Sequence, residues 1–190
     1  MQRKLTSWQE IFTNIQPSKP GNMGNLAIGF NYNYMMIHTS MHDRLQSQHL
    51  TIGEITRNLS PEKRISRPAP EKWNIHDNMA HLARYQIIFI DRIQTILLED
   101  NPVFDRYTAE KDPGFTLFRN LFYPELLSSL EVQRKKIIEL IQSLDKSKLS
   151  RKGAHKKYGN LDIIQWTEFF LLHEAHHIFT IFQLAHDTGL

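Results

Sequence analysis

The chain contains no cysteine among its 190 residues. This absence excludes disulfide bonds and thiolate metal ligands, so any metal ion must be held by His, Asp or Glu. Long apolar runs are also missing, because no stretch approaches the roughly 20 residues of a transmembrane helix. The basic start, residues 1–4, is not followed by the apolar segment of a signal peptide. We therefore expect a soluble protein that stays in the cytoplasm.

The sequence also lacks a concentration of charge of one sign. Its 23 Lys and Arg residues against 20 Asp and Glu residues give a formal net charge of +3. The basic residues are scattered, and only short groups such as residues 134–136 and 156–157 occur. We interpret these groups as solvated faces rather than as a nucleic-acid patch, so nucleic acid is not an expected partner.

The first 42 residues differ in composition from the rest of the chain. Proline and glycine interrupt any periodicity there, at Pro17, Pro20, Gly21, Gly24 and Gly29. We expect residues 1–42 to form a flexible leader, within which a later methionine could serve as an alternative translation start. With 41% hydrophobic residues overall, the chain can bury one good core. The sequence thus predicts a single domain, residues 43–190, behind an N-terminal leader.

Four helices are expected in this domain from apolar residues spaced three and four apart. They span about residues 43–58, 74–98 and 124–144, with the last beginning near residue 161. An aromatic, irregular region with a turn at Pro113 precedes the third helix, and a polar link, residues 146–159, precedes the fourth. No strand-like alternation is visible. The expected fold class is therefore all-α, a four-helix bundle, whose sites are built from side chains projecting inward.

His173 and His177 are the strongest functional signal in the chain. Residues four apart on a helix project from the same face, so two imidazole nitrogens can aim at one point. These histidines replace core residues in the apolar seam of the last predicted helix. Burying them without partners would cost roughly 1–3 kcal/mol each. A metal ion would supply the partner, and hydrogen bonds to neighbouring core residues are the alternative.

Residues 173–177, His-Glu-Ala-His-His, also fit the H-E-x-x-H pattern of zinc proteases. The extended protease motif requires Gly and His where this chain has Thr180 and Gln183, which weakens that interpretation. A di-iron bundle needs two Glu-x-x-His pairs, and the sequence offers one. A mononuclear site with a third ligand from an upstream helix remains. His81, in a small and apolar section of its helix, is the best candidate for that ligand.

Several short motifs in the chain match those of a known protein family. They are the Pro-rich turn and Trp at 67–75, Ala-His-Leu at 80–82, Leu-Leu-Glu-Asp-Asn-Pro at 97–102, and His-Lys-Lys-Tyr-Gly at 155–159, which leads to Trp166 and residues 173–177. Together they resemble the DinB/YfiT-like metal-dependent enzymes over about residues 43–185. The chain departs from many relatives at Asn74, Ile75 and Asn78 and in its leader, but none of these departures touches the expected ligands.

The resemblance implies a four-helix bundle that holds one divalent metal ion through His81, His173 and His177. Zinc or nickel is expected first, with manganese or iron as further options. His176 is turned about 100° from His177 around the helix, so we expect it beside the seam, either supporting a metal ligand or packing. Three neutral imidazoles leave coordination positions open, as in a catalytic site.

The residues expected to bind substrate are Asn78, Tyr85 and Trp166. The first two lie one turn before and after His81, and Trp166 begins the apolar seam of the last helix. Arg106, Tyr107 and residues 115–122 could form a wall over the metal, or could simply pack as an ordinary loop. No catalytic residue is assigned.

The resemblance implies an enzyme that acts on a small-molecule thiol or electrophilic substrate. Thiol S-transfer of the bacillithiol type is favoured, and hydrolysis of small substrates is the companion prediction. The alternative is a non-catalytic bundle that binds a metal or ligand in a stress response. A third function class is a nucleic-acid-associated damage-response protein. For the oligomeric state, a homodimer is an option.

Overall fold

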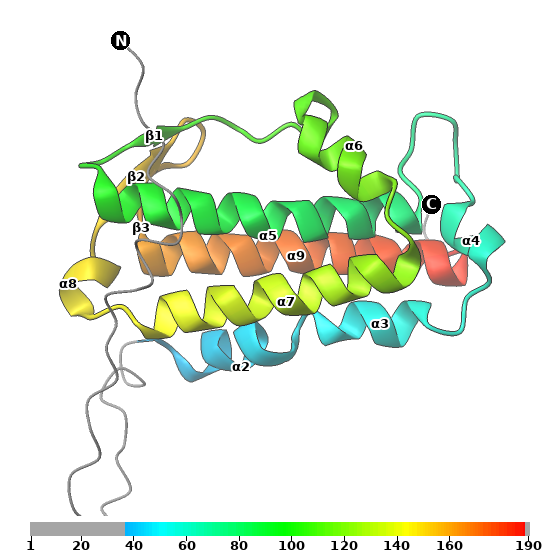
Figure 1. Cartoon of the computed structure of the whole chain (residues 1–190), viewed down its shortest axis with the longest axis horizontal. Helices are drawn as coiled ribbons and strands as arrows, with labels where there is room; N and C mark the ends of the chain where they lie inside the picture. The colour runs from blue at the N-terminus through cyan, green and yellow to red at the C-terminus, as the bar shows by residue number, and fades with distance from the viewer. Residues whose placement is uncertain (1–36, 189–190) are drawn as a thin grey trace, which may run out of the picture. The chain divides into compact units, whose positions relative to one another are not determined.

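The structure is a computed structural model, and it describes residues 37–188. Four columns of helix run lengthwise beside one another (Figure 1). The columns are α2 (Thr39–Ser47) followed by α3 (Leu50–Thr56), α5 (Ile75–Leu98), α7 (Tyr123–Gln142) and α9 (Ile163–His186). Shorter helices join them: α4 (Pro61–Ile65), η2 (Ala109–Lys111), α6 (Pro113–Arg119) and α8 (Lys146–Leu149). The predicted four-helix bundle is confirmed.

The long helices begin where side chains can cap them. The Asn74 side chain accepts a hydrogen bond from the Asp77 backbone nitrogen at 2.7 Å, and the Asp77 carboxylate accepts one from the Asn74 backbone nitrogen at 3.4 Å. This reciprocal arrangement satisfies donors that the first turn would leave unpaired. Asp162 and Gln165 do the same for α9. The bounds predicted for the second helix are confirmed, and Pro124 lies in the first turn of α7 as expected.

The prediction of the first helix is wrong in two respects. The observed helical segment begins at Thr39 rather than near residue 43, and it is broken into α2 and α3 at Gln48 and His49. At the break, the backbone nitrogens of Thr51 and Ile52 bond three residues back, at 3.2 Å each, instead of four. Such bonds tighten the turn between the end of α2 and the start of α3.

Part of the predicted leader belongs to this first column. Residues 1–36 lie outside the described residues, but residues 39–42 form the first turn of α2. Met41 is only 4% exposed and packs in the core beside Leu45. The bundle therefore begins at Thr39, earlier than predicted, because its apolar face already starts at Met41.

A small sheet also contradicts the expectation that no strands occur. The strands β1 (Val103–Phe104), β2 (Lys152–His155) and β3 (Gly159–Asp162) pair in that order. β1 runs parallel to β2, and β2 and β3 form an antiparallel hairpin in which Gly159 has a φ of 76°. The strands have two to four residues, too few to display alternation in the sequence. Pro113, expected in a turn, instead begins α6 behind the cap residue Asp112.

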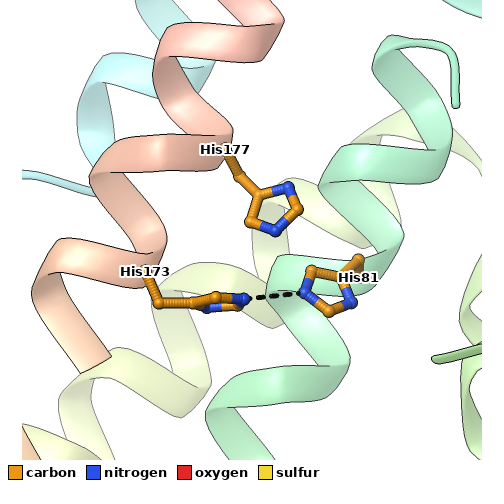
Figure 2. A group of neighbouring side chains, drawn as sticks. All are labelled: His81, His173 and His177. Carbon is orange, nitrogen blue, oxygen red and sulfur yellow. Dashed lines mark hydrogen bonds between the residues drawn. The ribbon is translucent and has the colours of Figure 1, made fainter. Parts of the chain in front are cut away.

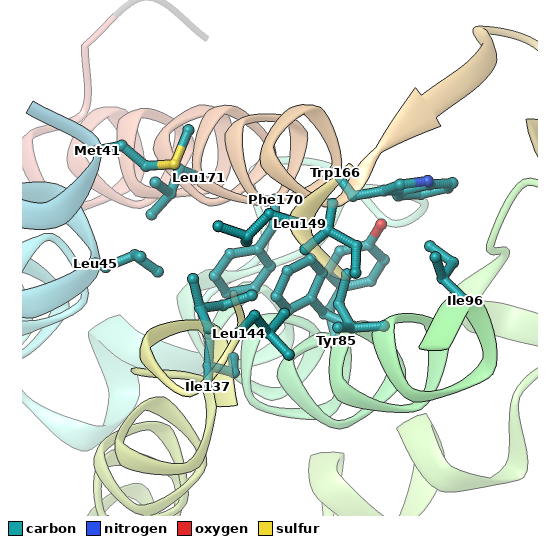
Figure 3. Close-up of a cluster of buried hydrophobic side chains, with 14 residues drawn as sticks. Met41, Leu45, Tyr85, Ile96, Ile137, Leu144, Leu149, Trp166, Phe170 and Leu171 are labelled. Atoms are coloured by element: carbon teal, nitrogen blue, oxygen red, sulfur yellow. The ribbon is translucent and has the colours of Figure 1, made fainter. Parts of the chain in front are cut away.

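Two apolar clusters fill the bundle. One contains Tyr85, Phe89, Trp166 and Phe170 together with residues of α2 and α7 (Figure 3). The other contains residues from the opposite ends of the same helices, including Met79 of α5 and Ile181, Leu184 and Leu126. On α9, His173 and His177 fall between the residues of the two clusters, whereas His81 on α5 lies among residues of the second cluster, next to Ala80 and Leu82. Within residues 37–188, no helix is both long and apolar enough to cross a membrane.

Candidate metal centre

Three histidines from two helices converge in the interior of the bundle. His81 projects from α5, and His173 and His177 project from successive turns of α9 toward it (Figure 2). One ring nitrogen from each lies within 4.8 Å of the others. The Nε2 atoms of His81 and His173 are 3.1 Å apart. Two nitrogens bound to one tetrahedral zinc ion at 2.0–2.1 Å lie roughly 3.3 Å apart, so this spacing fits a shared ion.

The rings of His81 and His173 have few hydrogen-bond partners among the described residues. The Nδ1 atoms of His81 and His173 are buried, and neither has a partner among the described residues. Their Nε2 atoms meet only one another, and in a neutral pair one of the two donates to the other. An ion between the Nε2 atoms would engage both lone pairs. The donor set, three imidazoles, suits zinc, nickel, copper or iron.

Burial keeps these histidines in the neutral form that binds metals. Desolvation lowers the pKa of His81 to about 2, with further lowering from His177 and His173. It lowers the pKa of His177 to about 3, with the neighbouring His173 and His176 adding to the effect. It also lowers the pKa of His173 to about 4, aided by His176 and Arg92. All three rings are therefore neutral at physiological pH, and no proton has to leave before a metal binds.

Asn78 orients His177 and, with Trp73, His176 and His177, lines a cavity of about 560 Å³. Its Oδ1 lies 2.8 Å from His177 Nδ1, and its Nδ2 donates to the Asn74 carbonyl at 2.8 Å. Because an amide oxygen only accepts, His177 carries its proton on Nδ1 and presents the Nε2 lone pair to the site. The sequence predicts Asn78 as a substrate contact, and that stays a prediction. The one-turn spacing from His81 did not indicate the hydrogen bond of Asn78 to His177.

Glu174, the glutamate of the H-E-x-x-H pattern, points away from the histidines. It is fully buried and forms an ion pair with Arg134 of α7, which is also fully buried. It accepts a second hydrogen bond from Gln48 Nε2 at 2.8 Å. Because this carboxylate is paired with Arg134 and Gln48 in the core, it cannot act as a general base at the histidines. The interpretation of residues 134–136 as a solvated face is wrong for Arg134, although Lys135 and Lys136 are exposed.

A cavity of about 760 Å³ opens beside the histidines. Tyr85 lines it, as expected of a substrate-binding candidate, and packs on His173 with 4.2 Å between ring centroids. Trp166 does not line it. Its indole is 1% exposed, and its Nε1 donates to the Gly153 carbonyl in the core. The prediction of Trp166 as a substrate contact is therefore not supported, because an inward-facing position on α9 at that level leads to the apolar cluster.

The wall over the histidines comes from the segment after β1. Arg106 and Tyr107 line the cavity, and the Tyr107 ring stacks over His81 at 5.6 Å. The Tyr107 hydroxyl donates to Asp112 Oδ2 at 3.0 Å, and the Arg84 Nε donates to the same oxygen at 2.7 Å. Burial and this carboxylate raise the pKa of Tyr107, so the phenol stays protonated. These bonds hold the wall in place.

Residues 115–122 and His176, both expected near the site, lie at different places relative to the cavity. Within residues 115–122, Phe115 is buried in the second apolar cluster behind Trp73, so this segment supports the wall without lining the cavity. His176 is exposed and lies at the mouth of the cavity, next to His177, with 5.2 Å between ring centroids. Trp73, not anticipated as a site residue, lines the cavity and packs on His81 at 5.0 Å.

Comparisons with known proteins support the same architecture. A profile of the DinB superfamily matches residues 49–181, a span that contains all three histidines. The chain is 25% identical over 134 residues to YuaE of Bacillus subtilis, covering 64% of this chain and 83% of YuaE. It is 22% identical over 142 residues to a protein of Oceanobacillus iheyensis whose name proposes a metal-dependent hydrolase, covering 73% of this chain and 80% of that protein.

A solved structure has the same fold. YfiT from Bacillus subtilis is described as a probable metal-dependent hydrolase with an unusual four-helix bundle topology. It superimposes with a TM-score of 0.67 at 15% sequence identity, covering 92% of this chain and 95% of YfiT. At this identity the likeness establishes the fold alone.

Proposed function

Because the chain belongs to the DinB superfamily, we propose that it is a metal-dependent enzyme in which His81, His173 and His177 hold one divalent ion. The observation that carries the proposal is the convergence of three neutral imidazoles at the wall of a cavity. Three protein ligands leave coordination positions for a water or a substrate atom. The names of the Oceanobacillus protein and of YfiT, both described as metal-dependent hydrolases, support the same class of activity.

An ion bound here would lower the pKa of a coordinated water to near 7, or hold a thiol as its thiolate. The surrounding residues prepare the site for either reaction. Asn78 fixes the tautomer and direction of His177. Trp73, Tyr85 and Tyr107 pack around His81, with ring centroids 5.0 to 5.8 Å away, and exclude water from its faces. We propose thiol S-transfer to a small electrophile as the first reaction and hydrolysis as the second.

The reaction and the metal can be tested on the purified chain. Metal content after purification, followed by loading with zinc, nickel, manganese or iron, identifies the ion. The loaded protein is then assayed for conjugation of a low-molecular-weight thiol to 1-chloro-2,4-dinitrobenzene and for hydrolysis of a p-nitrophenyl ester. His173→Ala and His177→Ala should each lose the metal and the turnover. His176→Ala, beside them on α9, is the matched control and should retain the metal.

The alternative is a non-catalytic bundle that binds a metal or small ligand. It predicts stoichiometric metal in the wild-type chain, lost in His173→Ala, with no turnover in either assay. Equal metal loss in all three histidine variants would show that the ligand assignment itself is wrong. A homodimer stays a separate prediction, which sedimentation of the purified chain addresses.

A further inference from the structure

One part of the cavity is lined by three positively charged side chains and a histidine. Arg92 from α5, Arg106 from the segment after β1, and His155 and Lys157 from the β2–β3 hairpin line it together. We call these four residues the cationic subsite. The parallel register, in which Phe104 pairs with His155, brings the residues after β1 beside the residues after β2.

Little negative charge balances this subsite. Arg92 is 8% exposed, and its guanidinium donates to two neutral oxygens, the Tyr85 hydroxyl at 3.2 Å and the Asp105 carbonyl at 2.9 Å. Within residues 37–188, neither Arg92 nor Arg106 nor Lys157 forms an ion pair. Glu110 is the one carboxylate among the described residues that line the cavity. A nearly buried cation without a counterion is costly, and an anionic ligand would offset that cost.

His155 adds a fixed hydrogen-bond donor. Its Nδ1 accepts from the backbone nitrogens of Lys157 at 3.1 Å and Tyr158 at 3.3 Å. Because Nδ1 accepts both bonds, the proton of the neutral ring lies on Nε2. The ring is 4% exposed and packs against Tyr158, Trp166 and Phe169, which prevent it from turning. No described residue accepts a hydrogen bond from its Nε2.

Tyr85 connects the cationic subsite to the histidines. Its ring packs on His173, and its hydroxyl accepts the hydrogen bond from Arg92. The two sites are therefore about one tyrosine side chain apart along the same cavity. A small molecule could place an anionic group at one site and its reacting atom at the other.

We propose that the cationic subsite binds the carboxylate or phosphate of the substrate, and that the enzyme therefore selects anionic small molecules. This inference rests on the proposed function for the reacting end of the substrate. The subsite itself makes a separate claim, because its four residues are distinct from the three histidines. Carboxylates and phosphates share the oxygen geometry that Arg and an imidazole N–H recognise.

The first experiment needs no metal, so it is independent of the proposed function. Succinate, inorganic phosphate and the neutral analogue succinamide are titrated into the metal-free full chain by calorimetry. We expect saturable binding of succinate or phosphate and none of succinamide, and the stronger of the two identifies the anion chemistry. Arg106→Gln/Lys157→Gln should weaken this binding by about tenfold or more, equivalent to about 1.4 kcal/mol.

A matched control removes the same charge elsewhere. Lys135→Gln/Lys136→Gln deletes two exposed lysines of α7 outside the cavity and should leave the affinity unchanged. The inference would be overturned if neither anion binds, or if the two double variants lose the same amount of anion affinity. Either outcome is independent of metal binding. Far-ultraviolet circular dichroism of each variant verifies that the fold is kept.

The second experiment links the subsite to the histidines. Zinc-loaded protein is titrated with 3-mercaptopropionate and with 2-mercaptoethanol, which share a thiol but differ in charge. We expect the anionic thiol to bind about tenfold more tightly, and Arg106→Gln/Lys157→Gln to remove that preference at unchanged zinc content. Equal affinities in the wild-type chain would show that the subsite does not serve the reaction. Absence of zinc would instead contradict the proposed function alone.

Discussion

The side-chain oxygen of Asn78 lies 2.8 Å from the Nδ1 of His177 and is held there by the bond from its own amide to Asn74. This is a carbonyl-type acceptor behind a histidine ligand, an arrangement that fixes tautomer and ring direction at metal sites. It also couples the cap of α5 to the candidate metal centre.

Replacing Asn78 by Leu should therefore weaken metal affinity by roughly 10–100-fold without removing any ligand. Asn78→Asp keeps an acceptor oxygen and should retain most of the affinity. Competition with a chelator of known strength measures both. A leucine variant with wild-type affinity would show that the Asn78–His177 bond does not matter to the site.

The buried ion pair between Arg134 and Glu174 makes a prediction about stability. Glu174→Gln leaves a buried guanidinium without its counterion and should lower the free energy of unfolding by about 3–5 kcal/mol. Arg134→Met/Glu174→Leu removes both charges and should recover most of that loss. Urea denaturation of the three proteins decides this. A protease-type general base would behave differently, because Glu174→Gln would then abolish turnover at unchanged stability.

His49 should make the stability of the metal-free chain pH-dependent. It is 7% exposed, and burial together with Arg134 lowers its pKa to about 4, against 6.5 for the free side chain. Between these values the unfolded chain binds a proton that the folded chain does not. The stability contribution is thus complete above pH 6.5 and is lost as the pH falls toward 4.

One such proton changes the free energy of unfolding by at most about 1.4 kcal/mol per pH unit. His49→Gln should flatten the slope of stability against pH by up to that amount between pH 6.5 and 4. Comparing the two metal-free proteins cancels the histidines of the metal centre, which are present in both. Identical slopes would mean that His49 is protonated as easily in the fold as in the unfolded chain.

The boundary of the leader can be tested by two truncations. Removing residues 1–36 should leave the melting temperature nearly unchanged, because their Pro- and Gly-rich sequence has no apolar face to contribute to a core. Removing residues 1–42 also deletes the first turn of α2 and Met41. Loss of a buried Met side chain costs about 2–5 kcal/mol, so the melting temperature should fall by about 5 °C or more. A large fall in the first truncation would contradict the predicted leader.

Local rules predicted much of the fold because they act within one helix. The cap at Asn74 and the proline at Pro124 specify where α5 and α7 begin, and the sequence carried both signals. The same rules failed at the break between α2 and α3, where Gln48 reaches across to Glu174 and the carbonyl of Leu171. They also missed the short strands: β1 pairs with a segment some fifty residues away, as at Val103 and Ala154, and the strands of the β2–β3 hairpin are only four residues long.

The sequence by itself determined that His173 and His177 share one face of a helix, because the helical repeat fixes the direction of residues four apart. It also excluded cysteine ligands and disulfides. The tertiary structure decided the rest of the site. It determined that Asn78 orients His177, that Glu174 forms an ion pair with Arg134, and that the Trp166 side chain is buried in the core. These outcomes depend on which side chains from distant segments meet when α5, α7 and α9 pack, and helical spacing alone carries no information about that meeting.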